Sequence, residues 1–571
     1  MGSMANRNPI HTPICSELWS LDQCVLVATP PLRSRVRFGF VWRDRLYVDR
    51  ASCHSMAPPP GRTTVAMARI RRRSLPDGGG AGGVDRLSAL PDDLLRLILC
   101  RLDTRTALST AALARRWARL PRELPALRLR VSDVLPRRYR RALALRRSHP
   151  PWCPAAAVHD LDALIARCER RAMRALADGV AGLLEADGGD GDGRRAKTLC
   201  LEFFPTEDAA CVDRLIATAI GVWGVEDLEV VVRSPLPNHH DRPAAYAFPH
   251  HCLDDELHRS RLRSLTLGNC TAPPLYRYGA LAELVLRDMP ATTPMSAYRS
   301  LFTARSPLQA LRLESCRCAG QRLVISAPSS RLRELVVDGC SFLAIELRTL
   351  PALERLACLP DTVALRFGAV PRLAHVSLAF RRQSVPGHDG LGCFLEGATT
   401  VTSLAVRFTG PERWVVPRTL DTRLSGLRRL LVADVPSSWD VTWPRLLLLA
   451  APSLEVLHIH VAASPVQEPP GREISWQPSR FRHRRLKEVA LAGFGRTWRQ
   501  IFFVRYLARV CRALERVALL KEWSVRGNGL WDWELAQQQE CPWSEEEKTV
   551  VRKQVKYGKT WSRPHLQVLV G

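Results

Sequence analysis

The sequence predicts an α+β protein in which a module of three short helices precedes an irregular α/β solenoid of short repeats. Residues 84–130 combine a dense apolar pattern with helix signals, and a short leucine-spaced motif recurs from residue 196 onward. The chain has 571 residues, of which 46% are hydrophobic. It is therefore long enough for several units with substantial cores.

The first 83 residues show no sustained periodicity. They contain Pro58-Pro59-Pro60 and Gly78-Gly79-Gly80. Segments of this composition cannot bury enough apolar surface to offset the entropy of ordering, so residues 1–83 are predicted to be a disordered extension. Met67 is a candidate for the natural start of the chain, because the segment before it has no structural pattern.

Residues 84–130 carry the signals of three short helices. Pro91 suits the first helical position because it lacks an amide that would be unpaired there, and the two aspartates after it complement the helix dipole. Asp103 or Thr104 can cap the second helix. Apolar side chains surround more than half of the first helix, namely Leu94, Leu95, Leu97, Ile98, Leu99 and Leu102.

Such a small module makes a poor core by itself. Each of its first-helix apolar side chains would forgo about 1.5 to 3 kcal/mol if it stayed in water. A partner protein is the simplest cover for this helix. The alternative is a helical hairpin buried inside a larger domain.

The pattern closely resembles the F-box of plant F-box proteins. That family has a Leu-Pro-Asp/Glu start, a Leu/Ile-rich first helix and a Leu-Ser-Arg/Lys-Arg-Trp element, which here reads Leu113-Ala114-Arg115-Arg116-Trp117. The resemblance implies docking on the Skp-type adaptor of a cullin-RING ubiquitin ligase. The adaptor contacts that carry over are Leu90, Pro91, Leu94, Leu95, Ile98, Leu102 and Trp117.

Residues 131–195 are predicted to be a helical linker. A helix is expected around Val158 to Cys168, followed by a flexible glycine-aspartate joint from Asp187 to Gly193.

From residue 196 a motif of the form L-x-x-L-x-L recurs thirteen times. Its starts in the middle of the chain lie 19 to 28 residues apart, which fits irregular leucine-rich repeats over residues 196–485. An ordinary α/β sheet stays open as the runner-up, although the number of recurrences favours the solenoid. The thirteen motifs start at residues 196, 225, 262, 281, 308, 332, 353, 373, 401, 427, 454, 486 and 514.

Residues 486–560 resemble, more loosely, the FBD region that often follows the repeats in plant F-box proteins. The segment includes a helical stretch from Ile501 to Cys511 and a capping box of Ser544 with Glu547. Residues 561–571 are expected to be a tail.

The cysteines are predicted to be reduced intracellular thiols. The chain has 17 of them without a short-spaced framework or a Cys-x-x-Cys pair, so a location in the nucleus, the cytoplasm or both is expected. In three repeats Cys270, Cys316 and Cys340 occupy the position where a small side chain turns inward. Neither Cys316 with Cys318 nor the histidines between 239 and 251 are expected to bind metal, and no apolar run is long enough to span a membrane.

The net charge of +27 would ordinarily indicate nucleic acid or an anionic surface as partner. All but seven of the 83 basic residues are arginines, and they are spread through every segment of the sequence. We interpret this as compositional bias, so only non-specific nucleic-acid affinity is expected.

The chain has no glycine-rich loop of the form G-x-x-x-x-G-K-[ST], no G-x-S-x-G elbow and no H-E-x-x-H pair. We therefore expect a non-enzyme without cofactor or metal, a substrate receptor whose repeats hold an unknown target protein near the ligase. Alternatives are a scaffold or nucleic-acid-associated protein not engaged with a ligase, and a small-molecule receptor. Predicted target-binding positions face solvent between the buried leucines: Thr266, Val285, Arg312, Glu314, Val336, Asp338 and His458.

Overall fold

The computed structural model describes residues 89–112, 115–148, 155–187, 194–206, 209–233, 246–249, 260–303, 306–317, 322–359, 364–380, 395, 397–408, 423–436, 444–462, 481–537, 543–556 and 565–571. The predicted extension 1–83, most of the glycine-aspartate joint, Cys318 and the histidines at 239, 240, 250 and 251 lie outside the described residues.

The predicted three-helix module is present. It consists of α1 (Asp92–Leu99), α2 (Thr104–Ser109) and α3 (Arg115–Arg119), with 3-10 turns at Thr110–Ala112 and Leu120–Glu123. Asp103 caps α2 by accepting a hydrogen bond from the Thr106 amide at 2.9 Å, as the sequence predicts. Pro91 occupies the N-cap of α1, one residue earlier than expected, because its extended ψ of 151° precedes the first helical residue.

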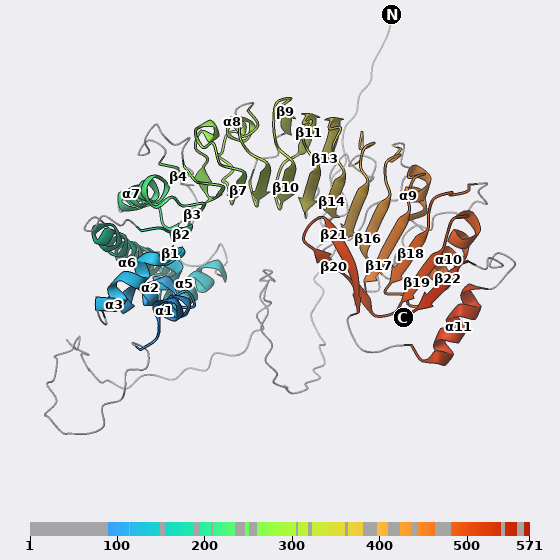
Figure 1. Ribbon diagram of the computed structural model, residues 1–571, viewed down its shortest axis with the longest axis horizontal. Helices are drawn as coiled ribbons and strands as arrows, with labels where there is room; N and C mark the ends of the chain where they lie inside the picture. Colours follow the sequence, from blue (N-terminus) through green and yellow to red (C-terminus); the bar gives the residue numbers. More distant parts are fainter. Residues whose placement is uncertain are drawn as a thin grey trace, which may run out of the picture. The chain divides into compact units, whose positions relative to one another are not determined.

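The repeats form one parallel sheet of 15 strands, which Figure 1 shows as a curved band. Neighbours in the sheet follow the order of the chain, with no reversal, and this order distinguishes a solenoid from the runner-up α/β sheet. The strands are β1 (Ala126–Arg130), β2 (Thr198–Phe203), β3 (Asp227–Val232), β5 (Ser264–Gly268), β7 (Glu283–Arg287), β8 (Ala310–Glu314), β10 (Glu334–Asp338), β12 (Arg355–Leu359), β14 (His375–Phe380), β15 (Ser403–Phe408), β16 (Arg429–Pro436), β17 (Val456–Ala462), β18 (Glu488–Ala492), β19 (Arg516–Leu520) and β22 (Gln567–Val570).

Each of the thirteen predicted motifs supplies one strand of this sheet, β2 to β19 in order. The other two strands, β1 and β22, are additions at the ends. β1 lies inside the segment 84–130, for which the sequence predicts only helices, and it pairs with β2 in the register Leu127 to Leu199. The helical module therefore leads directly into the first strand of the solenoid.

The segments that return from one strand to the next are irregular. Some contain helices, and three of them form a second parallel sheet of β9 (Arg322–Ser326), β11 (Ala344–Thr349) and β13 (Ala364–Ala369) along the outer side of the band (Figure 1). The short strands β4 (Tyr246–Ala247) and β6 (Cys270–Thr271) pair in the same way. The helices are α7 (Ala210–Thr218), continued by a π-turn at Ala219–Trp223, α8 (Met295–Ser300), α9 (Pro444–Ala450) and α10 (Trp498–Val510), with a 3-10 turn at Leu275–Arg277.

Several strands end in a residue with a left-handed backbone, followed by a side chain that enters the core. Asn269 and Ser315 have φ of 50° and 53°, and Gly339 has φ of 61°. The next residues are Cys270, Cys316 and Cys340, all buried. Glycine and small polar residues tolerate this backbone best, so these positions define the turn that closes each repeat.

The remaining helices are those of the linker and the C-terminal part. Between β1 and β2 lie α4 (Val131–Val134), α5 (Arg137–Ser148) and α6 (Ala155–Asp187), and α6 contains the helix predicted around Val158 to Cys168. The C-terminal part adds a hairpin of β20 (Trp523–Asn528) and β21 (Asp532–Gln537), and then α11 (Glu545–Val555). The predicted capping box of Ser544 with Glu547 begins α11, and the predicted helix 501–511 is α10.

Candidate protein-interaction sites

Helix α1 has an inner and an outer apolar face. Leu95 and Leu99, one turn apart, are fully buried and belong to the continuous core of the chain. Leu94, Leu97 and Ile98 lie on the other side at i, i+3 and i+4 spacing and are exposed, with Leu97 at 63%. We call these three side chains and Leu102, which is also exposed, the α1 outer face.

The helical module holds α1 in this orientation through α3. Arg116 of α3 donates from Nε to the Asp92 carboxylate at 2.8 Å and from a terminal nitrogen to the Leu90 carbonyl at 2.6 Å. These charge-assisted bonds satisfy groups at the N-terminal end of α1. The α1 outer face is therefore presented on a helix whose start is fixed by its own module.

The seven predicted adaptor contacts differ in their exposure and form three groups. Pro91, Leu94, Ile98 and Leu102 are exposed. Leu90 is half-buried. Leu95 at 0% and Trp117 at 6% exposure are core residues, which does not favour direct adaptor contact by these two side chains. The adaptor-contact assignment stays a prediction. Leu97 is an apolar surface residue that the predicted set omitted, although its spacing from Leu94 places both on one helix face.

The second candidate site is the concave face of the large sheet, formed by strand side chains that point away from the core. In its middle part, β5 to β10, Thr266, Arg312, Glu314 and Asp338 are partly exposed, as predicted. Two other predicted positions, Val285 and Val336, are only 5% and 1% exposed, so they are not solvent-facing.

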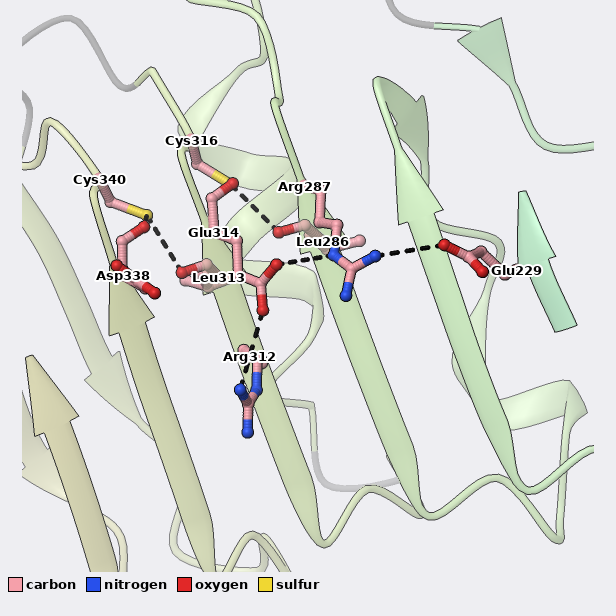
Figure 2. Close-up of polar contacts among 9 residues, drawn as sticks. All are labelled: Glu229, Leu286, Arg287, Arg312, Leu313, Glu314, Cys316, Asp338 and Cys340. Atoms are coloured by element: carbon pink, nitrogen blue, oxygen red, sulfur yellow. Dashed lines mark hydrogen bonds and ion pairs between the residues drawn. The ribbon is translucent and has the colours of Figure 1, made fainter. Parts of the chain in front are cut away.

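A chain of ion pairs crosses this middle part of the concave face. Figure 2 shows Arg287 between Glu229 and Glu314, at 3.2 Å and 2.6 Å, and Arg312 at 3.8 Å from Glu314. Arg287 of β7 reaches Glu314 on the neighbouring strand β8 and, across β5, Glu229 on β3, whereas Arg312 and Glu314 share β8. All four side chains are partly exposed. The site is thus a polar surface with alternating charges.

The turn cysteines lie behind this surface. The thiols of Cys316 and Cys340 donate to the carbonyls of Leu286 and Leu313, at 3.6 Å and 3.3 Å, each on the preceding strand (Figure 2). The inward, structural role predicted for these cysteines is confirmed. Cys316 is fully buried, which does not suit a metal ligand at the surface.

The C-terminal part of the concave face is covered by the β20–β21 hairpin. Trp533 of β21 packs on Leu431 and Ala433 of β16, and these three residues form a small buried cluster. The Arg429 guanidinium lies 4.6 Å from the Trp533 ring centre and 2.9 Å from the Asp532 carboxylate. The hairpin is therefore fixed to the sheet by both apolar and ionic contacts.

His458 lies beneath this hairpin. Its Nδ1 accepts a hydrogen bond from the Trp533 indole at 3.0 Å, and its Nε2 lies 3.3 Å from the Glu488 carboxylate. The indole can only donate, so the imidazole carries its proton on Nε2 when neutral. Burial lowers the pKa of His458. Contrary to the sequence prediction, His458 is therefore not open to solvent, because the hairpin covers it, and its role as a target contact stays a prediction.

Within the part of the chain that the structure describes, no group of three or more His, Cys, Asp or Glu side chains is arranged to hold a metal ion. None of the helices in those same segments has the length and apolar character that crossing a bilayer requires.

Comparison with known families identifies both parts of the molecule. The model of the F-box domain matches residues 87–128, and the model described as At1g61320/AtMIF1, LRR domain, matches residues 191–542. The chain is thus an F-box protein with leucine-rich repeats. More specifically, it belongs to the At1g61320/AtMIF1 type of leucine-rich-repeat family. No curated protein matches the chain significantly.

This combination of an F-box and leucine-rich repeats supports a substrate-recognition role in Skp-cullin-F-box (SCF) ubiquitin ligases in general, and it is typical of non-catalytic adaptors. An F-box implies binding to a Skp-type adaptor in general. The FBD resemblance stays a prediction. Residues 488–520 continue the same parallel sheet as strands β18 and β19.

Proposed function

We propose that this protein is a substrate-recognition subunit of an SCF-type ubiquitin ligase in the nucleus, the cytoplasm or both. The single observation that carries the proposal is the α1 outer face, which leaves Leu94, Leu97, Ile98 and Leu102 in water on a helix whose inner face is already packed. Burying such side chains is worth about 1.5 to 3 kcal/mol each, so an apolar partner surface is expected there.

The target protein would bind the open middle part of the concave face, β5 to β10. This part offers partly exposed charged groups, and the hairpin covers the strands further along. Ubiquitin transfer itself would be catalysed by other subunits of the ligase, which receive the target at high effective concentration.

The adaptor interaction can be tested by co-purification of the full chain with a Skp-type adaptor. Leu94→Ser with Leu97→Ser is expected to weaken capture by more than tenfold, because two exposed apolar contacts are lost without a cavity in the core. Leu145→Ser with Leu449→Ser is the matched control, since both leucines are exposed on other helices.

Leu95→Ala serves as a reference for unfolding of the module, because that side chain is in the core. Equal capture by the two double variants would contradict the proposal. Absence of capture by the unaltered chain would favour a scaffold or nucleic-acid-associated protein that does not engage a ligase.

A further inference from the structure

Helix α5 is the most basic helix of the described chain. Six of its 12 residues are arginines and none is acidic. Arg146 pairs with Asp162 of α6 at 2.7 Å, whereas Arg137, Arg138, Arg140, Arg141 and Arg147 form no ion pair with any described carboxylate. Although arginines occur throughout the sequence, α5 therefore carries a local cluster of six, five of them outside any ion pair with a described carboxylate.

Two of these arginines line a cavity of about 350 Å³ next to α5. Arg140 and Arg147 contribute from the helix, and Arg233 contributes from the end of β3. Leu143 and Ala144 supply apolar wall, and Ser132 of α4 supplies a hydroxyl. A recess of this volume accommodates a small charged group and its immediate neighbours.

The nearby carboxylates compensate only part of this charge. Glu202 pairs with Arg233 at 2.7 Å and accepts the Ser132 hydroxyl at 3.3 Å. Glu169 accepts the Tyr139 hydroxyl at 2.9 Å, and burial raises the pKa of Glu169, which favours its neutral form. The positive charge of the cavity therefore comes from Arg140 and Arg147.

We propose that this cavity binds the phosphate of a phosphorylated side chain on a bound protein. A phosphomonoester carries about −1.5 to −2 charge at neutral pH and has three acceptor oxygens, which two guanidinium groups can bind in forked pairs. The apolar wall suits the aliphatic part of a phosphorylated residue. The inference rests on the proposed function, because the phosphorylated protein would be the target.

A nucleic-acid strand fits this cavity less well. Binding of single strands uses exposed aromatic side chains on which bases stack. Tyr139 is the aromatic residue of the lining, and it is buried with its hydroxyl bonded to Glu169. The recess also takes one phosphate group, whereas a duplex presents a continuous row of them.

The test uses the full chain and a peptide library with a fixed central phosphoserine, measured by fluorescence anisotropy. Arg140→Gln with Arg147→Gln is expected to weaken phosphopeptide binding by at least tenfold, because each lost forked pair is worth about that factor. Arg138→Gln with Arg141→Gln is the matched control, with the same charge change on the same helix, and a loss below twofold is expected.

Four probes separate the possible sources of phosphate: the phosphoserine library, the same library unphosphorylated, inorganic phosphate, and a 20-base-pair DNA duplex. The proposal expects the phosphoserine library to bind most tightly. Equal losses in the two double variants, tighter binding of the duplex, or a preference for inorganic phosphate would overturn it.

Arg140→Lys with Arg147→Lys keeps the charge but removes the planar fork, so intermediate binding is expected if geometry matters. Adaptor capture is measured on the same variants. Normal capture with lost phosphopeptide binding supports the cavity, and normal capture with unchanged phosphopeptide binding refutes it without affecting the proposed ligase role.

Discussion

The middle and the C-terminal parts of the concave face are built from the same repeat but present different surfaces. Across β5 to β10 the outward side chains include Arg287, Arg312 and Glu314, which pair with one another and remain partly exposed. Across β15 to β18 they include the small or apolar Ala405, Leu431 and Ala433, and the β20–β21 hairpin packs on them. The choice of outward residues therefore decides whether a stretch of solenoid is an open surface or a closed one.

The size of the outward side chains is the physical reason why the hairpin covers one part of the concave face and not the other. Ala405 and Ala433 leave room above β15 and β16, and the Trp533 ring fills it with Val525 beside it. In the middle part, the long charged side chain of Arg312 stands at the position equivalent to Ala405 and favours water. Over β15 and β16 the hairpin buries apolar surface, whereas over the middle part it would have to remove water from ion pairs.

The largest effect is expected for Trp533→Ala. Replacing a buried aromatic residue with alanine costs about 3 to 5 kcal/mol in a core, and we expect the lower end because one side of the hairpin stays in water. Loss of about 3 kcal/mol should speed amide exchange in residues 523–537 by about 100-fold, with β5 to β10 unchanged. Hydrogen exchange measured by mass spectrometry checks this.

Trp498→Ala is the control for that variant, because Trp498 is 63% exposed on α10. Its exchange pattern in the hairpin should match the unaltered chain. Unchanged hairpin exchange in Trp533→Ala would mean that other contacts hold the hairpin and that the two parts of the face differ for another reason.

The hairpin should also loosen as pH falls. Burial lowers the pKa of His458 below its usual 6.5, so above that pH the imidazole is neutral in both the folded and the released states. Below pH 6.5 the released state takes up a proton first, and stability is lost as pH falls through the lowered pKa. If Nδ1 were protonated, it could also no longer accept the hydrogen bond from the Trp533 indole, because both groups would then be donors.

His458→Asn removes this titration while keeping an acceptor for the indole. Hairpin exchange compared at pH 7.5 and 5.5 should change less in the variant than in the unaltered chain. His375 and His483, whose pKa values burial also lowers, titrate with the same sign in both proteins, so the difference isolates His458. Identical pH dependence would contradict the role given to His458.

Most of the solenoid could be predicted because each repeat is a local pattern. The strand β1 also had a readable signal, since Leu124, Leu127 and Leu129 have the motif spacing, but the strong helix signals before it concealed the repeat. For α1, the sequence spacing of Leu95 with Leu99 and of Leu94 with Leu97 could be used to assign these leucines to two different faces of the helix. Composition alone could not say which face is buried.

The covered part of the concave face could not be predicted in the same way. Gly527, Asn528 and Gly529 indicate a turn, and Gly529 has φ of 77°. The hairpin contacts, however, join residues far apart in sequence, such as Trp533 with His458 over 75 residues and Val525 with Arg407 over 118. A repeat pattern carries no information about such a contact, so the sequence alone predicts a solvent-facing position for His458.

The smallest effect is expected in the open part, for Arg287→Gln. Its ion pairs with Glu229 and Glu314 are partly exposed, and such pairs contribute about 0.2 to 1 kcal/mol. Thermal unfolding should therefore shift by no more than a few degrees, and less at high salt because exposed charges are screened. A loss as large as that of Trp533→Ala would show that the ion pairs, and not only the covered part, hold the face together.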